Sequence, residues 1–176
     1  MQVYLTDLEA YNNGRLVGTW YELPMSEDEL TKACDDVLAT GKHACKHEHN
    51  HEELFITDYE DFPFKVEEFS NINELNKKAQ VLEDMEEKDD IKKISILMTN
   101  GLFTDFYEAC EHVDELIDTG ETDMSDIAYN IVEESGALST CGNLGAYIDY
   151  EKYGRDLEIE GSYFQDENSN IYEFVG

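Results

Sequence analysis

Basic side chains are the scarcest charged groups in this sequence. Its 176 residues include 12 Lys and Arg against 42 Asp and Glu, which gives a formal net charge of −30 at pH 7. No Lys or Arg lies between Lys93 and Lys152. A surface of this sign repels nucleic acid and anionic membranes and attracts basic partners. We therefore expect no direct binding to nucleic acid or to a membrane.

Long apolar runs and paired cysteines are also missing. No stretch approaches the ~20 apolar residues of a membrane span. The N-terminus lacks the basic and apolar regions of a signal peptide. No CxxC pair occurs among the cysteines, which are Cys34, Cys45, Cys110 and Cys141. This pattern predicts reduced thiols and a cytoplasmic location.

Sequence motifs of catalysis are absent too. The chain contains no GxSxG, HExxH, P-loop or GxGxxG. Carboxylate pairs occur throughout, so none stands out as a general acid and base. The sequence predicts no catalytic residue and no cofactor, and we expect that the protein is not an enzyme.

Hydrophobic residues, at 41% of the chain, are plentiful enough for folded cores. Their patterns predict an α+β fold with a small antiparallel sheet plus helix at each end and a helical middle segment. The predicted domains are a sheet-plus-helix domain at 1–64, a helical domain at 65–103, and helices with a β-hairpin at 104–176.

Local signals predict the individual elements. The first domain should contain strands at 3–8 and 15–23, a helix from the capping box of Ser26 and Glu29 to a stop at Gly41, and a strand at 54–59. Ser70 should cap the next helix, and Asp89 or Asp90 the one after it. The chain should end with a helix from Asp123 or Ser125 to Gly136, a short helix near 144–150, and a hairpin of strands 157–164 and 171–175.

The stretch 104–118, TDFYEACEHVDELID, is predicted as one amphipathic helix. Its apolar residues recur at the i, i+3, i+4, i+7 spacing of a buried face, while carboxylates occupy the opposite side. Like charges at i, i+4 disfavour a helix by roughly 0.2–0.5 kcal/mol per pair. The predicted helix contains several such pairs in spite of their repulsion, which indicates that the charge has a function.

Residues 42–53, KHACKHEHNHEE, place histidines and a cysteine at alternate positions. An extended segment would turn them all to one side, where zinc or nickel could bind. Adventitious binding and a plain solvated loop are the alternatives, because ligands at i, i+2 on one strand rarely complete a tetrahedron. We predict no functional metal site; the candidates for one are Cys45, His47, His49 and His51.

Asp166–Asn170 resembles the start of a calcium loop, but Ile171 occupies the position of the required glycine. We interpret the segment as a turn with Asn in left-handed conformations. An acidic metal- or calcium-binding protein that uses the His/Cys-rich loop is the alternative function. An ordinary enzyme or structural protein from a high-salt organism, in which acidity serves solubility, is a further alternative. Scarce Arg with plentiful Ile, Asn and Lys is more typical of an AT-rich genome.

Tyr147–Leu157, YIDYEKYGRDL, joins tyrosines to the only Arg after Arg15. From the residues alone, Gly154 is expected to cap the end of a helix and Arg155 to pair with a neighbouring carboxylate. With this segment the sequence resembles the ArdA antirestriction proteins of mobile genetic elements, namely conjugative elements such as conjugative transposons, and phages. The family motif is Tyr153, Gly154, Arg155, Asp156 and Leu157.

The resemblance extends over most of the chain. It includes YNNGRLVGTW at 11–20, FPFKVEEFSNINELN at 62–76, IVEESGAL at 131–138 and IYEFV at 171–175. The His/Cys-rich loop at about 38–52 departs from it, because it is longer than is usual in the family.

The resemblance implies an elongated, three-domain α+β protein that forms a homodimer through its C-terminal domain. It also implies a mimic of bent duplex DNA. Such a mimic would act in the cytoplasm of a host bacterial cell, in the DNA-binding groove of the specificity and modification subunits of a type I restriction–modification enzyme. No catalytic residue and no cofactor come with the resemblance.

The magnitude of the charge agrees with DNA mimicry. Duplex DNA carries one charge per ~1.7 Å of axis, so a charge of −30 matches roughly 50 Å of duplex and a dimer roughly 100 Å. The predicted phosphate surrogates are Glu27, Asp28, Asp35, Glu67, Glu68, Glu83, Asp84, Glu86, Glu87, Asp105, Glu108, Glu111, Asp114, Glu115, Asp118, Asp123, Asp126, Glu133 and Glu134.

Overall fold

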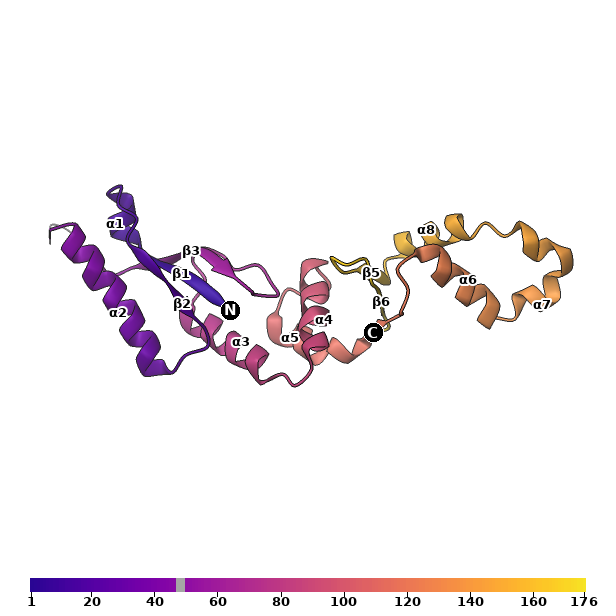
Figure 1. Ribbon diagram of the computed structural model, residues 1–176, viewed down its shortest axis with the longest axis horizontal. Coiled ribbons are helices and arrows are strands. Elements are labelled where there is room, and N and C mark those ends of the chain that lie inside the picture. The colour runs from indigo at the N-terminus through magenta and orange to yellow at the C-terminus, as the bar shows by residue number, and fades with distance from the viewer. Residues whose placement is uncertain (47–49) are drawn as a thin grey trace. The chain divides into compact units, whose positions relative to one another are not determined.

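The computed structural model describes residues 1–46 and 50–176 (Figure 1). Its contacts divide the chain into two compact units, Met1–Ile91 and Lys92–Gly176, and helix α4 (Lys88–Thr99) crosses the boundary between them. Each unit contains a three-stranded antiparallel sheet. The predicted α+β class is therefore confirmed, while the division into three domains stays a prediction.

The sheet of the first unit has the order β2-β1-β3. Its strands, β1 (Gln2–Asp7), β2 (Gly18–Glu22) and β3 (Leu54–Glu60), confirm the predicted ones. The link between β1 and β2 is not a simple turn, because it contains the short helix α1 (Leu8–Asn12). The Asp7 side chain starts that helix by accepting a hydrogen bond from the Ala10 amide at 2.8 Å.

Helix α2 (Glu27–Ala44) packs Leu30, Ala33 and Val37 into the core of the first unit. Its capping box is confirmed: Ser26 Oγ accepts from the Glu29 amide, and Glu29 Oε2 accepts from the Ser26 amide at 3.0 Å.

The predicted helix stop at Gly41 is wrong, because α2 continues to Ala44. Gly41 is buried, and a Cβ there would overlap the carboxylate of Asp7. The glycine therefore allows close packing of the helix on the end of β1, not a turn.

Two further helix starts are shifted by a residue or two from the prediction. Asn71, not Ser70, caps α3 (Ile72–Asp84) by accepting from the Asn73 amide at 2.9 Å. Helix α4 begins at Lys88, so Asp89 and Asp90 lie in its first turn and do not cap it. Acidic residues are favourable at both kinds of position, because the N-terminal end of a helix carries partial positive charge.

The single helix predicted over 104–118 is wrong. The structure has the short helix α5 (Phe106–Glu111), a 3₁₀ turn (Val113–Glu115) and the strand β4 (Leu116–Asp118). The strand forms because its main chain pairs with β6 (Ile171–Phe174), which also pairs with β5 (Tyr163–Gln165). This pairing between distant segments overrides the local helical pattern.

Helices α6 (Met124–Glu134) and α8 (Tyr150–Glu160) pack on the sheet of the second unit around Ile127, Ala128, Leu157 and Ile171. The segment between them contains α7 (Ala137–Cys141) and a 3₁₀ stretch (Gly142–Tyr147). The helix from Asp123 is confirmed, with Asp123 as its cap. The short helix predicted near 144–150 is wrong, because the 3₁₀ stretch ends in this segment and α8 begins there.

Two predictions near the C-terminus are corrected. The strand predicted over 157–164 is wrong in its first part, because α8 runs to Glu160 and ends at Gly161, whose φ is 85°. Gly154 is a buried residue inside α8 and not its cap. A Cβ there would lie 2.6 Å from the main-chain oxygen of Met124, so the absence of a side chain lets α8 approach the start of α6.

We predict that Gly154→Ala destabilises the second unit by roughly 2 kcal/mol, the middle of the range for an overpacked core. The expected cause is displacement of α8 from the Met124 carbonyl. Urea unfolding followed by circular dichroism measures the change, with Glu158→Ala on the exposed side of α8 as the control. Equal stability of the two variants would contradict this account of the packing.

Candidate interaction surface

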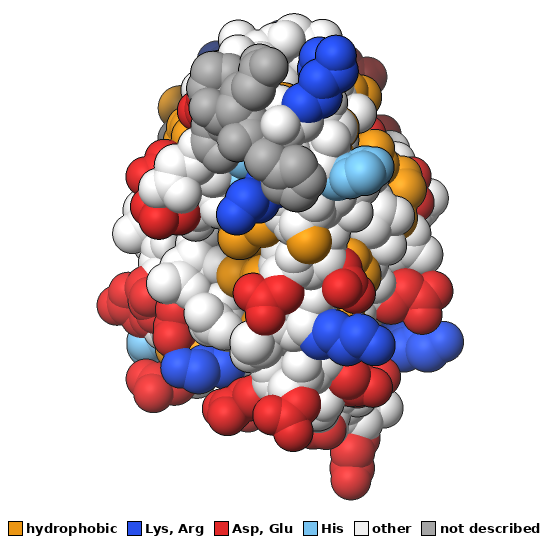
Figure 2. All heavy atoms as spheres, turned by 90° about the vertical axis from the view of Figure 1, so that its left-hand side faces the viewer, with side chains coloured by type: hydrophobic (Ala, Val, Ile, Leu, Met, Phe, Trp, Pro, Cys, Tyr) orange, Lys and Arg blue, Asp and Glu red, His pale blue; other side chains and the backbone are white. Residues whose placement is uncertain are grey.

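The predicted phosphate surrogates of the first unit are all exposed. They lie on α2, in the segment before α3, at the end of α3 and in the link to α4: Glu27, Asp28, Asp35, Glu67, Glu68, Glu83, Asp84, Glu86 and Glu87. Figure 2 shows one face of the first unit, on which acidic side chains spread over the lower half with few basic ones between them. The first unit thus offers a broadly acidic surface.

In the second unit the predicted surrogates are exposed, except that Glu115 is partly buried. They are distributed over α5, the 3₁₀ turn, β4 and α6: Asp105, Glu108, Glu111, Asp114, Glu115, Asp118, Asp123, Asp126, Glu133 and Glu134. The expected row of carboxylates on one long helix does not exist, because 104–118 is not one helix.

Several of these acids are held in place by hydrogen bonds to the main chain. Asp105 Oδ1 accepts from the amides of Tyr107 and Glu108 at 2.9 and 3.0 Å. Asp118 Oδ1 accepts from the Gly120 amide at 2.8 Å. Such bonds fix the position of the charge as well as starting a helix or turn.

Asp123 shows how such a bond affects ionisation. Its Oδ1 accepts from the hydroxyl and the amide of Ser125 at 2.7 and 2.8 Å. The hydroxyl bond first, and then the amide bond, lower the pKa of Asp123 below its usual value. The carboxylate at the start of α6 therefore stays ionised at neutral pH.

A few acids lie beside a basic or imidazole side chain. Lys65 Nζ lies 2.8 Å from Glu67 Oε1, and His112 Nδ1 lies 2.9 Å from Glu115 Oε2. The Lys65–Glu67 pair is largely exposed, and exposed pairs contribute little stability and are screened by salt. These pairs leave most of the predicted surrogates unaffected.

The family motif at Tyr153–Leu157 has a structural role in this fold. Leu157 is buried in the core of the second unit, Tyr153 packs against that core, and Gly154 contacts the start of α6. Arg155 was expected to pair with a carboxylate, but its Nε donates to the main-chain oxygen of Glu151 at 3.4 Å. The motif thus positions α8 against α6.

In the described residues, the His/Cys-rich segment forms neither of the arrangements considered, an extended row of ligands or a plain solvated loop. His43 belongs to α2, Cys45 is buried at the end of that helix, and His51 is buried elsewhere in the unit. His47 and His49 lie outside the described residues. Within residues 1–46 and 50–176, no group of three or more His, Cys, Asp or Glu could hold a metal ion.

His51 instead forms a buried pair with Asp7 that the sequence did not reveal. Its Nδ1 lies 2.6 Å from Asp7 Oδ2, and both side chains are completely buried. The other oxygen of Asp7 caps α1, while Gly41 of α2 packs against this carboxylate. The pair therefore joins β1, α1, α2 and the segment before β3, and no local signal links residues so distant in sequence.

The turn predicted at Asp166–Asn170 is confirmed. Asp166 Oδ1 accepts from the amides of Asn168 and Asn170 at 2.8 and 2.9 Å, and its Oδ2 accepts from the side chain of Asn170. The left-handed residue is Ser169, with φ of 67°, and not an asparagine as predicted. Both carboxylate oxygens are engaged in shaping the turn.

The fold and this surface define a strongly acidic α+β protein made of two small units, with carboxylates exposed on both. A family model described as antirestriction protein (ArdA) matches residues 3–171. The chain belongs to the ArdA family, so antirestriction is the function its membership supports, with restriction–modification enzymes as partners. The family consists of inhibitor proteins and is not a known enzyme family.

Two further findings concern the chain as a whole. No curated protein shows significant similarity to it. In the described residues, the helices are all too short or too polar to cross a membrane.

We predict that His51→Ala destabilises the first unit by roughly 3 kcal/mol, because it leaves the buried Asp7 carboxylate without its partner. Urea unfolding gives the change in the free energy of unfolding. His43→Ala on the exposed side of α2 is the matched control and should change stability much less than His51→Ala, because its side chain is not buried. A similar small effect at His51 would show that the pair contributes nothing.

Proposed function

We propose that the protein inhibits type I restriction–modification enzymes by mimicking duplex DNA. In this proposal it occupies the groove in which the specificity and modification subunits hold DNA, and it does not itself bind nucleic acid. The observation that carries the proposal is the exposure of the predicted phosphate surrogates on both units of a chain with net charge −30. Family membership supports the antirestriction part of it.

Charge density makes the mimicry physically reasonable. A groove for DNA is lined with Lys and Arg, and DNA binding gains much of its affinity from releasing counterions at such contacts. A folded protein with about as many negative charges as 50 Å of duplex can displace the same ions. Carboxylates bound to the main chain, such as Asp105 and Asp123, present their charge at defined positions.

A homodimer formed through residues 104–176 is part of the proposal. This segment exposes large hydrophobic side chains, and exposed hydrophobic groups are frequent at interaction sites. They include Tyr129, Leu144, Tyr147 and Ile159, with Tyr147 84% and Ile159 82% exposed. A dimer would extend the matched length of duplex to roughly 100 Å, on the order of 30 base pairs.

The proposed partner, a restriction–modification enzyme, also suggests where the protein acts and which kind of genome encodes it. Restriction–modification enzymes act on DNA that enters a bacterial cell, so we place the protein in the cytoplasm of the host. We further propose that it is encoded on a mobile genetic element, either a conjugative transposon or a phage, because such an element gains from the inhibition.

Neutralising several acids together should weaken inhibition, although each acid alone contributes little. We predict that the fivefold variant Glu108→Gln, Glu111→Gln, Asp126→Asn, Glu133→Gln and Glu134→Gln raises the concentration for half-inhibition at least tenfold. Each single change should raise it less than about fivefold, since one exposed charge pair contributes 0.2–1 kcal/mol. The measurement is DNA cleavage by a type I enzyme at increasing inhibitor concentration.

The matched control exchanges Glu and Asp at the same five positions and so keeps every charge. It should inhibit like the parent protein. If the wild-type protein at molar excess leaves both DNA binding and cleavage by the type I enzyme unchanged, the DNA-mimic proposal is rejected.

Salt should act on folding and on inhibition in opposite directions. Screening relieves repulsion among the carboxylates, so the melting temperature is expected to rise between 50 and about 500 mM NaCl. Screening also weakens contacts with the enzyme, so binding should fall steeply over the same range. Calorimetry and a binding titration measure the two trends. Inhibitor binding that is independent of salt would contradict a charge-based mimic.

A further inference from the structure

Strand β2 forms one edge of the sheet in the first unit, because the strand order is β2-β1-β3. Hydrogen bonds at its two ends show which main-chain groups face β1. The Asp7 amide donates to the Val17 carbonyl and the Leu23 amide donates to the Met1 carbonyl, both at 2.9 Å. Main-chain groups point alternately toward and away from the partner strand in an antiparallel pair.

This alternation directs the N–H and C=O groups of Trp20 and Glu22 away from β1, toward the open edge. The Gly18 carbonyl also points outward, but it accepts the Tyr4 hydroxyl at 3.0 Å. An edge strand with outward main-chain groups is a template onto which another extended segment can pair.

A groove runs along this edge between β2 and α2. Its larger part, about 560 Å³, is lined on the strand by Trp20, Tyr21 and Glu22 and on the helix by Glu29, Lys32 and Asp36. A second hollow beside Val17–Thr19 shares Tyr21 and Asp36 with the first and extends the groove to the other end of the strand.

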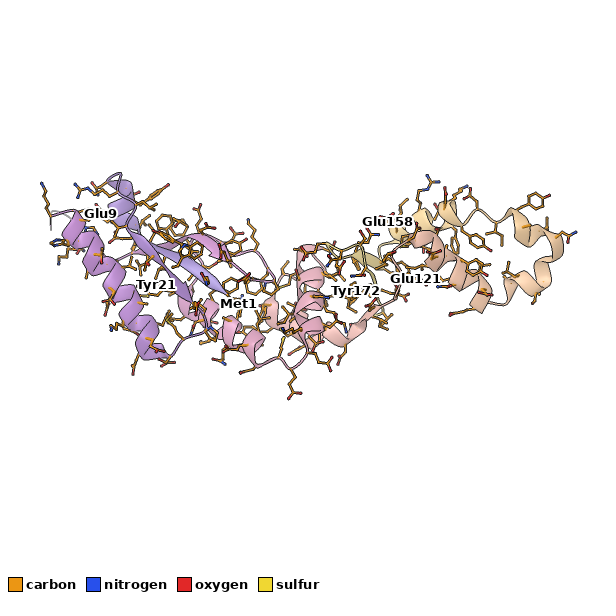
Figure 3. The ribbon with its side chains drawn as sticks, viewed as in Figure 1. Met1, Glu9, Tyr21, Glu121, Glu158 and Tyr172 are labelled. Carbon is orange, nitrogen blue, oxygen red and sulfur yellow. The ribbon has the colours of Figure 1, made fainter. Side chains whose placement is uncertain are left out.

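Tyr21, labelled in Figure 3, lines both hollows. Its hydroxyl donates to the Ala33 carbonyl of α2 at 3.2 Å, which fixes the spacing of strand and helix. Burial, and then the nearby charge of Asp36, raise the pKa of Tyr21. Asp36 lines both hollows together with Tyr21.

The charges of the groove indicate the chemistry of its occupant. Glu22, Glu29 and Asp36 line it, and Lys32 is the only cation among the residues that line its larger part. A second copy of this chain is a poor occupant, because its 42 acidic residues would meet an acidic groove. An extended segment with Lys or Arg matches both the edge and the charge.

We propose that the edge of β2 and the groove beside α2 bind an extended, basic segment of another polypeptide, which adds to the sheet as a fourth strand. Main-chain bonds to Trp20 and Glu22 would supply the pairing. The acids that line the groove would select Lys or Arg at alternate positions, which lie on one face of a strand. The proposal does not depend on DNA mimicry, since it requires neither the surrogates of the second unit nor a restriction enzyme.

Trp20 provides a direct signal for the experiment, because it is the only tryptophan in the chain and lines the groove. The probe is a capped seven-residue peptide of alternating Lys and Thr, titrated into the full-length protein while Trp20 fluorescence is recorded. We expect a saturable change, with amide NMR shifts concentrated at β2 and α2. Shifts concentrated elsewhere would overturn the proposal.

Two N-methylated forms of the peptide test strand pairing at constant charge. One carries methyl groups on the Lys amides and the other on the Thr amides, and only one set can face β2. One form should lose at least about tenfold in affinity, as expected for lost main-chain bonds, while the other retains binding. Equal affinities for all three peptides would overturn strand addition.

A neighbouring pair of acids on α2 supplies the matched variants. Asp36 lines the groove, whereas Asp35 is exposed beside it and does not. Asp36→Asn should weaken peptide binding roughly two- to fivefold, the range for an exposed ion pair, and Asp35→Asn should weaken it less. Equal effects would mean general attraction to an acidic surface. A Trp20 signal that changes with protein concentration in the absence of peptide would instead assign the edge to a second copy.

Discussion

Repulsion among carboxylates is the constraint on which both units depend. With a net charge of −30, the folded state brings together groups that the unfolded chain keeps apart. Helix N-termini offset part of this repulsion, because they carry partial positive charge. The side chains of Asp7, Asp105, Asp123 and Asp149 accept main-chain hydrogen bonds at the starts of α1, α5, α6 and α8. Each acid there meets unpaired N–H groups and the positive end of the helix dipole.

Local signals in the sequence were sufficient to predict the elements whose conformation depends mainly on residues close together in the chain. The capping box of Ser26 and Glu29 and the three strands of the first unit were predicted correctly, and Asp123, the cap of α6, was one of the two predicted starts of that helix. The helix predicted over 104–118 failed because Leu116 pairs with Phe174, and hydrophobic periodicity carries no information about so distant a partner. Gly41 and Gly154 were mistaken for helix ends because close packing and chain reversal both favour glycine.

The interaction surface was predictable in composition but not in arrangement. Exposure of the acidic residues follows from their chemistry, and nearly all of the predicted surrogates are exposed. Their spacing depends on the fold, so the expected row along one helix became a set of positions on α5, a 3₁₀ turn, β4 and α6. The burial of His51 against Asp7 was equally hidden, because it brings together segments 44 residues apart.

Under the proposed mimicry, anchoring would make the carboxylates unequal as substitutes for phosphate. A Glu side chain on a helix surface loses up to about 2 kcal/mol of conformational entropy when a partner immobilises it. Asp105 and Asp123 have already lost most of that freedom, because Oδ1 of each is bound to the main chain. Both residues are exposed, so the second oxygen can meet a partner's Lys or Arg without that loss. The same bonds that stabilise a crowded acidic fold would therefore also prepare its charge for the proposed binding, so that the two requirements on this sequence would reinforce each other.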